Sequence, residues 1–414
     1  MYPKVRFRGF DEPWKTKNVS STFDIITDYV ANGSFESLRK NVVTYKSYNY
    51  AYMIRLQDAS NNWQGPWLYT DKKGYNFLSK SKLFPGDIVM SNVGSVGLFY
   101  LIPDLGKPMT LAPNSILLRS SFENNRFLFS LMNSNLIKTQ IEKEKSPGAQ
   151  PKINKTDFKK IKLVIPQRTE QNVIANLFKV IDSLLSLQQR KLELENELNR
   201  FYIGKIFANN NNYPELRFSS FNNSWEIAKL KEIITHKSGS PIEKYFSENG
   251  PLKVISIGSY GLDNSYIDQK IRAERNNVTE KYMVQKNDLT MVLNDKTSDC
   301  RILGRVLIIN NDNEYVANQR TEIITPNKTV YPQFLYQLIN GAFRTKIKKI
   351  AQGGTQIYVN FKSVEKLKLS IPEYEEQKDI SKFLGLIKNK LSFEQSNVTI
   401  TQQLKQFLLQ NLFI

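Results

Sequence analysis

The spacing of hydrophobic and polar positions changes character part-way along the chain, and the same change recurs later. Residues 1–166 hold short runs of strand-forming residues between Gly- and Asn-rich turns. Asp87–Met90 and Leu98–Ile102 have the composition of strands, and Ser91–Gly97 between them has that of a tight turn. Around Arg126–Ile141 the apolar residues recur every three or four positions, which predicts a helix. The pattern therefore indicates a strand-rich domain with a few helices.

After Pro166 the pattern becomes helical over a long stretch. Glu170–Lys205 has no proline, and the same pattern returns from Glu376. The apolar positions of the two stretches follow three- and four-residue steps: Ile174, Leu177, Ile181, Leu184, Leu194, Leu198 and Phe201, then Ile380, Phe383, Leu384, Ile387, Leu391, Val398, Leu404 and Phe407. Each stretch predicts a helix of about 36 residues, or about 54 Å. Such a helix can pack wholly on its own domain. We expect instead that the two helices pack against each other, because one small domain cannot cover that length; Gln188 and Lys191 make the heptad imperfect.

The chain repeats itself from end to end. The opening Pro3–Phe7, followed by Phe10 and Trp14, returns 211 residues later as Pro214–Phe218, Phe221 and Trp225. A second set of matches has an offset of 206 residues. It pairs Ile165-Pro166 with Ile371-Pro372, Glu170-Gln171 with Glu376-Gln377, and Gly148-Ala149-Gln150 with Gly354-Thr355-Gln356. The ends of the module are thus alike while its interior diverges. That divergence is either loop drift or a difference in what the two copies recognise.

The repeat predicts an α+β protein with two similar strand-rich domains, residues 1–166 and 209–372. A long helix follows each domain, within residues 167–208 and 373–414. If these helices lie antiparallel, a pseudo-two-fold axis relates the two copies, as in a symmetric dimer fused into one chain.

Charge is the strongest signal in the composition. Lys and Arg outnumber Asp and Glu by 58 to 39, a net charge of +19, which favours a polyanionic partner such as nucleic acid over a merely soluble basic protein. The single cysteine, Cys300, fits a reducing cytoplasm. We expect no membrane association, since no apolar stretch of about 20 residues, lipidation signal or signal-peptide core is visible.

Chemistry-bearing motifs are missing from the sequence. There is no phosphate-binding Gly-rich loop, no methyltransferase Asn/Asp-Pro-Pro-aromatic motif and no nucleophile elbow, and His236 is the single histidine. One histidine and one cysteine exclude an ordinary structural zinc site. Asp295 and Asp299 around Lys296 faintly resemble a nuclease site, but solvated loop carboxylates are the default reading and the first copy has no counterpart.

The duplicated ensemble resembles the specificity subunit of type I restriction–modification systems over nearly the whole chain. The features that carry this resemblance are the repeated Pro-x-hydrophobic-Arg-Phe openings, the Ile-Pro…Glu-Gln junctions and the helix after each junction. Pro85–Val89 resembles the family's Gly-Asp-Ile-Val strand, and Asn318–Arg320 another recurrent element. The interiors depart from the pattern, with Lys286–Asp288 in place of Pro-Gly-Asp and Ala112–Ser115 in place of Asn-Gln-Arg.

The resemblance implies two target-recognition domains that each bind one half of a bipartite, asymmetric site in double-stranded DNA. The helices would set the spacing and dock two modification subunits, and restriction subunits would join the complex. The chain itself would carry no catalytic residue, metal or cofactor; S-adenosylmethionine, ATP and Mg²⁺ would belong to the partners. Residues implied for helix docking and spacing are Ile174, Ile181, Leu198, Phe201, Ile380, Ile387, Leu404 and Phe407.

DNA contacts are expected from exposed loop residues with hydrogen-bonding or cationic side chains. The candidates are Gln150 and Lys152, then Thr355, Gln356 and Tyr358, then Ser91 and Asn92, and finally Asn294, Lys296, Thr297 and Arg301. Two alternatives stay open: a self-sufficient DNA methyltransferase or nuclease, and a two-lobed scaffold that binds only proteins. The recognised bases and the spacer length do not follow from the sequence.

Overall fold

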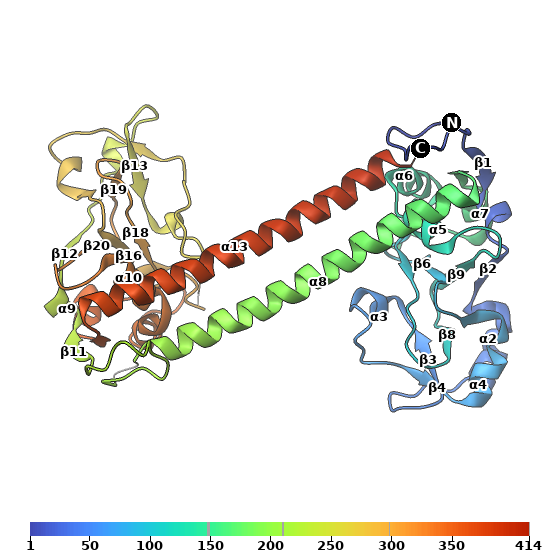
Figure 1. Cartoon of the computed structure of the whole chain (residues 1–414), viewed down its shortest axis with the longest axis horizontal. Coiled ribbons are helices and arrows are strands. Elements are labelled where there is room, and N and C mark those ends of the chain that lie inside the picture. The colour runs from blue at the N-terminus through green and yellow to red at the C-terminus, as the bar shows by residue number, and fades with distance from the viewer. Residues whose placement is uncertain (147–149, 209–210, 298, 414) are drawn as a thin grey trace. The chain divides into compact units, whose positions relative to one another are not determined.

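The computed structural model describes residues 1–146, 150–208, 211–297 and 299–413. The chain divides into two compact units, Met1–Gln189 with Ser396–Ile414 and Arg190–Gln395. Each unit contains one strand-rich domain and parts of two long helices, α8 (Arg168–Ile206) and α13 (Tyr374–Asn411) (Figure 1).

The first unit holds two four-stranded sheets and a two-stranded ribbon. The sheet orders are β2-β9-β6-β7 and β4-β3-β8-β5, and β1 pairs with β10. Strands β3 and β8 run parallel, while the other pairs are antiparallel. The elements before α8 are β1 (Lys15–Asn18), α1 (Val19–Thr22), β2 (Ile25–Asp28), η1 (Tyr29–Asn32), α2 (Phe35–Asn41), β3 (Ala51–Ile54), α3 (Leu56–Ser60), β4 (Tyr69–Thr70), α4 (Lys72–Phe77), η2 (Ser79–Ser81), β5 (Lys82–Leu83), β6 (Ile88–Ser91), β7 (Phe99–Leu101), β8 (Met109–Leu111), β9 (Ser115–Arg119), α5 (Asn125–Met132), α6 (Asn135–Glu144), α7 (Lys155–Lys160) and β10 (Lys162–Ile165).

The second unit repeats this plan with sheets ordered β12-β20-β16-β18 and β14-β13-β19-β15 and the ribbon β11-β22. It adds a two-stranded pair, β17-β21, that belongs to its loops. The elements before α13 are β11 (Glu226–Lys229), α9 (Leu230–Ile233), β12 (Ile234–Ser238), η3 (Glu243–Tyr245), β13 (Leu252–Ile255), η4 (Ile257–Ser259), β14 (Arg272–Ala273), η5 (Thr279–Tyr282), β15 (Met283–Val284), β16 (Leu289–Val292), β17 (Asn294–Asp295), β18 (Val306–Ile308), β19 (Tyr315–Ala317), β20 (Thr321–Pro326), α10 (Pro332–Leu338), the π-helix η6 (Ile339–Phe343), α11 (Arg344–Lys349), β21 (Ile357–Tyr358), α12 (Phe361–Val364) and β22 (Lys368–Ile371).

The predicted strands are confirmed, and one predicted helix is wrong. Strands β6 and β7 lie where the composition placed them, to within one residue at each end. The single helix predicted over Arg126–Ile141 is two helices, α5 and α6, because the chain turns at Asn133 and Ser134. Ser134 is the extended N-cap of α6, and Asn and Ser favour such caps over helix interiors.

Each domain core is completed by the end of the helix that follows the other domain. In the first unit Phe413 stacks on Phe178 at 5.9 Å between ring centroids and meets Trp14 edge-on at 6.5 Å. In the second unit Phe207, which lies 206 residues earlier, packs on Phe334 at 5.8 Å, and Phe334 in turn contacts Trp225. The repeated tryptophan is therefore a core anchor in both copies.

A buried ion pair explains why the opening motif and the Glu-Gln motif repeat together. Arg6 donates two hydrogen bonds to the Glu170 carboxylate, both at 2.8 Å. Arg217 binds Glu376 in the same way, at 2.8 and 2.7 Å. Both glutamates are almost completely buried. The opening segment of each copy is thus tied to the first turn of its long helix.

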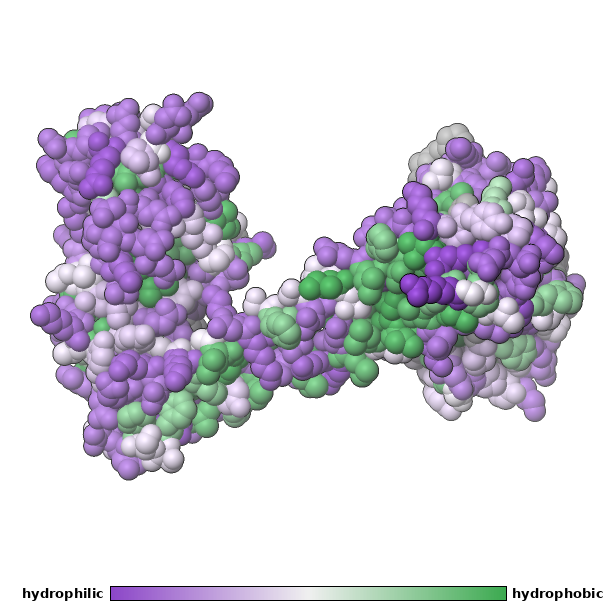
Figure 2. Space-filling view, turned by 45° about the horizontal axis from the view of Figure 1, so that its top comes forward, coloured by the Kyte–Doolittle hydropathy of each residue, from purple (hydrophilic) through white to green (hydrophobic). Residues whose placement is uncertain are grey.

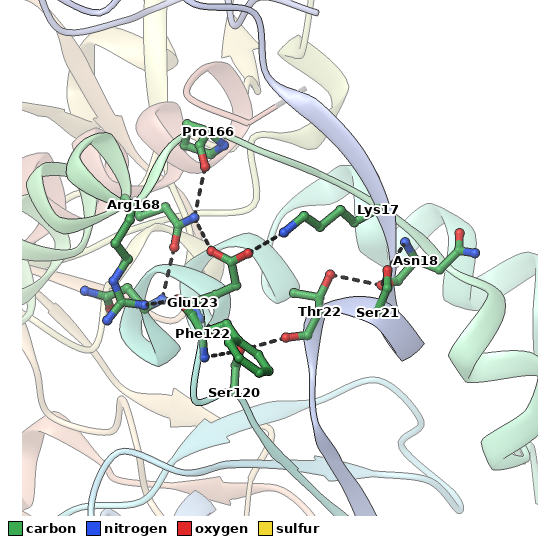
Figure 3. Close-up of polar contacts among 11 residues, drawn as sticks. Lys17, Asn18, Ser21, Thr22, Ser120, Phe122, Glu123, Pro166 and Arg168 are labelled. Carbon is green, nitrogen blue, oxygen red and sulfur yellow. Dashed lines mark hydrogen bonds and ion pairs between the residues drawn. The ribbon is translucent and has the colours of Figure 1, made fainter.

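The neighbouring glutamine completes this attachment (Figure 3). Gln171 donates to the Pro166 carbonyl at 2.9 Å and to Glu123 at 2.6 Å, and Glu123 also accepts from Lys17 at 2.6 Å. Burial raises the pKa of Glu123, but hydrogen bonds from Lys17 and Gln171 outweigh it, and the net pKa is lowered. In the second copy Gln377 donates to the Pro372 carbonyl at 2.9 Å.

The long helices pair antiparallel within each unit, as the sequence predicts. Asp182 binds Lys405 at 2.7 Å in the first unit. In the second, Glu195 binds Lys390 at 2.6 Å and Lys191 binds Glu394 at 2.5 Å, so residue numbers rise on one helix as they fall on the other. Among the residues described, no helix is long and apolar enough to span a membrane.

Candidate nucleic-acid interface

Equivalent hairpins lie just before α7 and α12 in the two domains. In the second domain Gln352 and Tyr358 exchange backbone hydrogen bonds of 2.9 Å. Gly353 has φ +101°, and a Cβ there would lie 2.1 Å from the Gln356 carbonyl oxygen, so this turn requires glycine. In the first domain Ser146 donates to the Lys152 carbonyl at 2.8 Å.

The predicted residues on these hairpins are exposed. They are Gln150 and Lys152 in the first domain and Thr355, Gln356 and Tyr358 in the second. The compared tripeptide of the first copy includes Gly148 and Ala149, which lie outside the described residues.

A second loop pairs with each hairpin and brings the remaining candidates to the same place. Ile153 donates to the Asn92 carbonyl at 3.2 Å, and Val359 donates to the Leu293 carbonyl at 2.9 Å. Asn294 is the register partner of Tyr358. Asn92 therefore lies beside the Lys152 hairpin, and Asn294 beside the Tyr358 hairpin, so the structure joins segments about 60 residues apart.

Ser91 is placed differently from the other candidates. It is 1% exposed, and its hydroxyl donates to the Ser95 carbonyl and accepts from the Leu98 amide at 3.1 Å. The side chain closes the turn after β6, which leaves Asn92 at the start of a fixed loop.

The corresponding loop of the second domain is longer. Gly97 and Gly304 end the two loops, both with positive φ and both against an isoleucine of the following helix, Ile141 or Ile347. Four residues separate Asn92 from Gly97, whereas ten separate Leu293 from Gly304. The loop 294–303 is therefore six residues longer than its counterpart in the first domain. It carries the exposed residues Lys296, Thr297 and Arg301.

Asp295 organises this insertion from within. It is 3% exposed and accepts from the Thr297 amide and hydroxyl at 2.8 and 2.7 Å and from the Ile302 and Leu303 amides at 2.6 and 3.2 Å. Burial raises the pKa of Asp295, but these donors outweigh it and lower the pKa overall. The carboxylate therefore ties Thr297 to Ile302 and Leu303.

Arg344 of α11 fixes the far side of the same loop. It donates to the carbonyls of Leu303 at 2.9 Å, Cys300 at 2.8 Å and Arg301 at 2.6 Å. Burial, together with the nearby Arg305, lowers the pKa of Arg344 to about 10. Arg301 itself binds Asp299 at 2.6 Å.

Two further buried carboxylates, Asp87 and Asp288, are used in the fold. Asp87 forms a bidentate pair with Arg119, both contacts 2.6 Å, and Asp288 accepts from Thr325 at 2.6 Å. Within the described parts of the chain, no cluster of three or more His, Cys, Asp or Glu residues could hold a metal ion.

The positive charge is concentrated in the domains. Residues 1–166 contain 24 Lys and Arg against 13 Asp and Glu, a net charge of +11, and residues 209–372 contain 23 against 16, or +7. The helical segments are nearly neutral, at +1 for residues 167–208 and 0 for residues 373–414. A polyanion is therefore attracted to the domains rather than to the helices.

The helix positions named from the sequence fall into two groups. Ile174 and Ile380 are buried in the core of the domain that precedes their helix. Ile181 is buried outside those clusters, and Ile387 is half-buried. The other four, all 44–53% exposed, are Leu198, Phe201, Leu404 and Phe407.

These exposed positions belong to one apolar stripe on each helix. The members recur mostly every seven residues: Val173, Val180, Leu184, Leu187, Leu194, Leu198 and Phe201 on α8, and Leu386, Phe393, Ile400, Leu404 and Phe407 on α13. Figure 2 shows hydrophobic side chains gathered on the parts of the helices next to the first domain. Single exposed apolar residues are ordinary, but a continuous stripe marks an interaction surface.

Tandem strand-rich domains that are cationic, differ in their loops and are joined to neutral paired helices define a class of modular nucleic-acid-recognition protein. The family model of the type I restriction modification DNA specificity domain matches residues 12–196 and 222–406. The chain belongs to this family, and it recognises DNA sequence within a type I restriction–modification system.

Curated relatives are distant in sequence. The chain is 23% identical to the type I restriction enzyme MjaVIII specificity subunit of Methanocaldococcus jannaschii over 59% of each protein. It is 22% identical to the putative MjaX specificity subunit of the same organism over 93% of this chain and 89% of the relative. The chain thus spans nearly all of one relative and 59% of the other.

Solved structures share the fold. A type I restriction-modification S subunit from M. genitalium superposes with a TM-score of 0.57 at 17% identity, covering 100% of this chain and 99% of the other. The S subunit from Thermoanaerobacter tengcongensis gives 0.50 at 13% identity, covering 97% and 96%. These identities support the fold alone.

Sequence reasoning missed the residues that shape the interface. Asp295 was considered only as part of a faint nuclease-like pair or as a solvated carboxylate, and Arg344 was not considered. The available signal was the six-residue difference between the loops, but locating it requires the equivalence of Gly97 with Gly304, which the structure supplies.

Proposed function

We propose that this chain is a non-catalytic specificity subunit whose two domains each read one half of a bipartite, asymmetric DNA target. The observation that carries the proposal is the pair of equivalent loops after β6 and β16. They share their boundaries but have four and ten residues between them, so the two domains offer different surfaces to DNA. Unlike surfaces read unlike half-sites.

The domain division follows the charge. Residues 1–166 and 209–372 act as the recognition domains, and residues 167–208 and 373–414 act as spacers. The exposed apolar stripes on α8 and α13, on nearly neutral segments, support docking of two modification subunits there, with restriction subunits joining the assembly. S-adenosylmethionine, ATP and Mg²⁺ then belong to those partners, and this chain holds none of them.

The DNA contacts are proposed for polar residues of the paired loops, all of them exposed except the half-buried Asn92 and Asn294. In the first domain these are Asn92, Gln150 and Lys152, with Ser91 supporting Asn92 from beneath. In the second domain they are Asn294, Lys296, Thr297, Arg301, Thr355, Gln356 and Tyr358. Lysine and arginine bind phosphates, while the amides and hydroxyls reach base edges.

Reconstitution tests this proposal. The chain is co-expressed with its modification subunit, and methylated positions are mapped by sequencing the host genome. We expect one motif of two unlike halves separated by a fixed gap, with the motif lost when this gene is deleted. A genome whose methylation is unchanged by the deletion would refute the proposal. Methylation or cleavage of DNA by the purified chain alone would refute its non-catalytic part.

A further inference from the structure

A cleft of about 580 Å³ opens in the first domain beside the Lys152 hairpin. Its walls come from η1 and α2, from the turn that follows β6, from the turn that precedes β9 and from the segment that precedes α7. One wall is apolar and exposed, with Phe35 at 72% and Val30 at 43%. Asn92 and Lys152 also line the cleft.

The side-chain amide of Asn92 lacks any hydrogen-bond partner among the residues described. Its Oδ1 is buried and unsatisfied, and its Nδ2 donates no bond. The backbone of Asn92 is nevertheless fixed, because its carbonyl accepts from Ile153 and Ser91 closes the turn before it. Nearly all buried polar groups in folded proteins are paired, so a rigidly mounted and unpaired amide on a cleft wall calls for a ligand that completes it.

The charges around the cleft favour an anionic ligand. Arg39 and Lys152 are exposed and form no ion pair within the described chain. Asp28 supplies a carboxylate to the lining, and Lys155 neutralises it at 2.8 Å. Among the described residues, the cleft therefore combines two cations without an ion-pair partner, exposed apolar side chains and the unpaired amide of Asn92.

We propose that Asn92 reads an adenine of the first half-site. The amide first turns about its own side-chain torsions, so that the Oδ1 that is buried in the free chain faces the cleft. Oδ1 then accepts from the adenine N6 amino group and Nδ2 donates to N7, the bidentate pairing that suits a side-chain amide and adenine. Arg39 and Lys152 bind the phosphates on either side of that base. The inference rests on the proposed DNA-reading function. It names one residue of the first domain and the one base which that residue reads.

The second domain supports this assignment by contrast. Leu293 occupies the position equivalent to Asn92, since Val359 donates to its carbonyl as Ile153 donates to that of Asn92. An apolar side chain cannot make the paired contact to adenine. The second half-site is therefore read by other residues, and Asn92→Leu places in the first domain a residue that the fold already accommodates.

Methylome sequencing of the complex formed with Asn92→Leu tests the inference. We expect one adenine of the first half-site to become degenerate, with the preference for it falling roughly ten- to a hundred-fold while the second half-site is unchanged. Thermal unfolding should show a stability equal to or higher than that of the wild type, because an unpaired buried amide has been removed. Asn92→Asp, which keeps the shape but loses the donor, should admit cytosine at that position, since a carboxylate accepts from either exocyclic amino group.

Asn135→Leu is the matched control, because Asn135 is exposed in the same domain and does not line the cleft. It should leave the motif unchanged. Arg39→Ala and Lys152→Ala should weaken binding to all sequences alike and reduce the salt dependence, without altering the motif. A folded Asn92→Leu complex with the wild-type motif overturns the inference. A wild-type complex without a bipartite motif overturns the proposed function instead.

Discussion

At the scale of single residues, the repeated motifs contain side chains that pair with each other although they are distant in sequence. Arg6 and Glu170 are 164 residues apart, and Arg217 and Glu376 are 159 residues apart, yet each pair forms the same fork-shaped contact. A buried carboxylate is tolerated only when it is paired. Each motif therefore appears in both copies because neither of its two charges is acceptable alone.

This pairing predicts an unequal response to mutation. Arg6→Met leaves Glu170 as an uncompensated buried charge, and we expect the unfolding free energy of the first unit to fall by about 3–5 kcal/mol. The double variant Arg6→Met, Glu170→Leu should recover most of that loss, because no charge is left buried. Urea denaturation, monitored by hydrogen exchange in the first unit, measures the loss in the single variant and the recovery in the double variant. Arg217→Met provides the same test in the second unit. Equal losses in the single and double variants would contradict the argument.

At the scale of elements, periodic segments were predictable and loop roles were not. The long helices were recognised from local spacing, and their observed bounds, Arg168–Ile206 and Tyr374–Asn411, follow that spacing. The same spacing cannot say what covers each apolar residue. Ile174 and Ile181 are buried, while Leu198 and Phe201 are exposed, although all four belong to one periodic pattern.

Loop function depends on contacts that sequence spacing does not contain. Ser91 and Asn92 are adjacent polar residues with the same expected role. The hydroxyl of the first closes a turn, and the amide of the second is unpaired on a cleft wall. The Ser91 hydroxyl bonds within its own turn, to Ser95 and Leu98, whereas the Asn92 carbonyl accepts from Ile153, about 60 residues further along. A single sequence without aligned relatives gives no signal for that contact.

The loop 294–303 offers a test of organisation by one carboxylate. In Asp295→Asn an NH₂ group can face the Ile302 and Leu303 amides, which need an acceptor, so the loop should exchange amide hydrogens much faster. Asp299→Asn is the control, because Asp299 is exposed and binds only the neighbouring part of the loop. Because the pKa of Asp295 is lowered on folding, its stabilisation is present above the ordinary carboxyl pKa and should fade as pH falls below about 4. Unchanged exchange in Asp295→Asn would contradict this role.

The end of each long helix completes the core of the other domain, and this arrangement gives a further prediction at the scale of elements. Phe413→Ala removes a ring that contacts Trp14, Phe127 and Phe178, so a cavity should form in the core of the first unit. We expect a loss of about 3–5 kcal/mol in the unfolding free energy of that unit. Phe207→Ala should produce the equivalent loss in the second unit. Hydrogen exchange resolved by segment measures each effect, and a loss spread evenly over both units in either variant would count against the assignment.

At the scale of the whole molecule, charge and hydrophobicity are divided between different parts of the chain. The recognition domains carry net charges of +11 and +7, and the helical segments carry +1 and 0. A neutral segment gains little binding free energy from a polyanion. Its apolar stripe gains binding free energy when it is buried against a protein surface. Under the proposed function, this division separates DNA binding from subunit assembly, so the two should be separable by mutation.

A pair of substitutions on the apolar stripes tests that separation. Leu187→Glu and Phe393→Glu place charges at positions that are 70% and 64% exposed, so the chain should fold as before. A buried charge without a partner is costly at an interface, and we therefore expect each variant to lose at least ten-fold in affinity for the modification subunit, measured by titration calorimetry. Gln189→Glu and Gln402→Glu add the same charge to exposed positions on the other side of each helix and should assemble normally. If stripe and control variants assemble equally well, the stripes do not bind the modification subunits, and the neutrality of the helices needs another explanation.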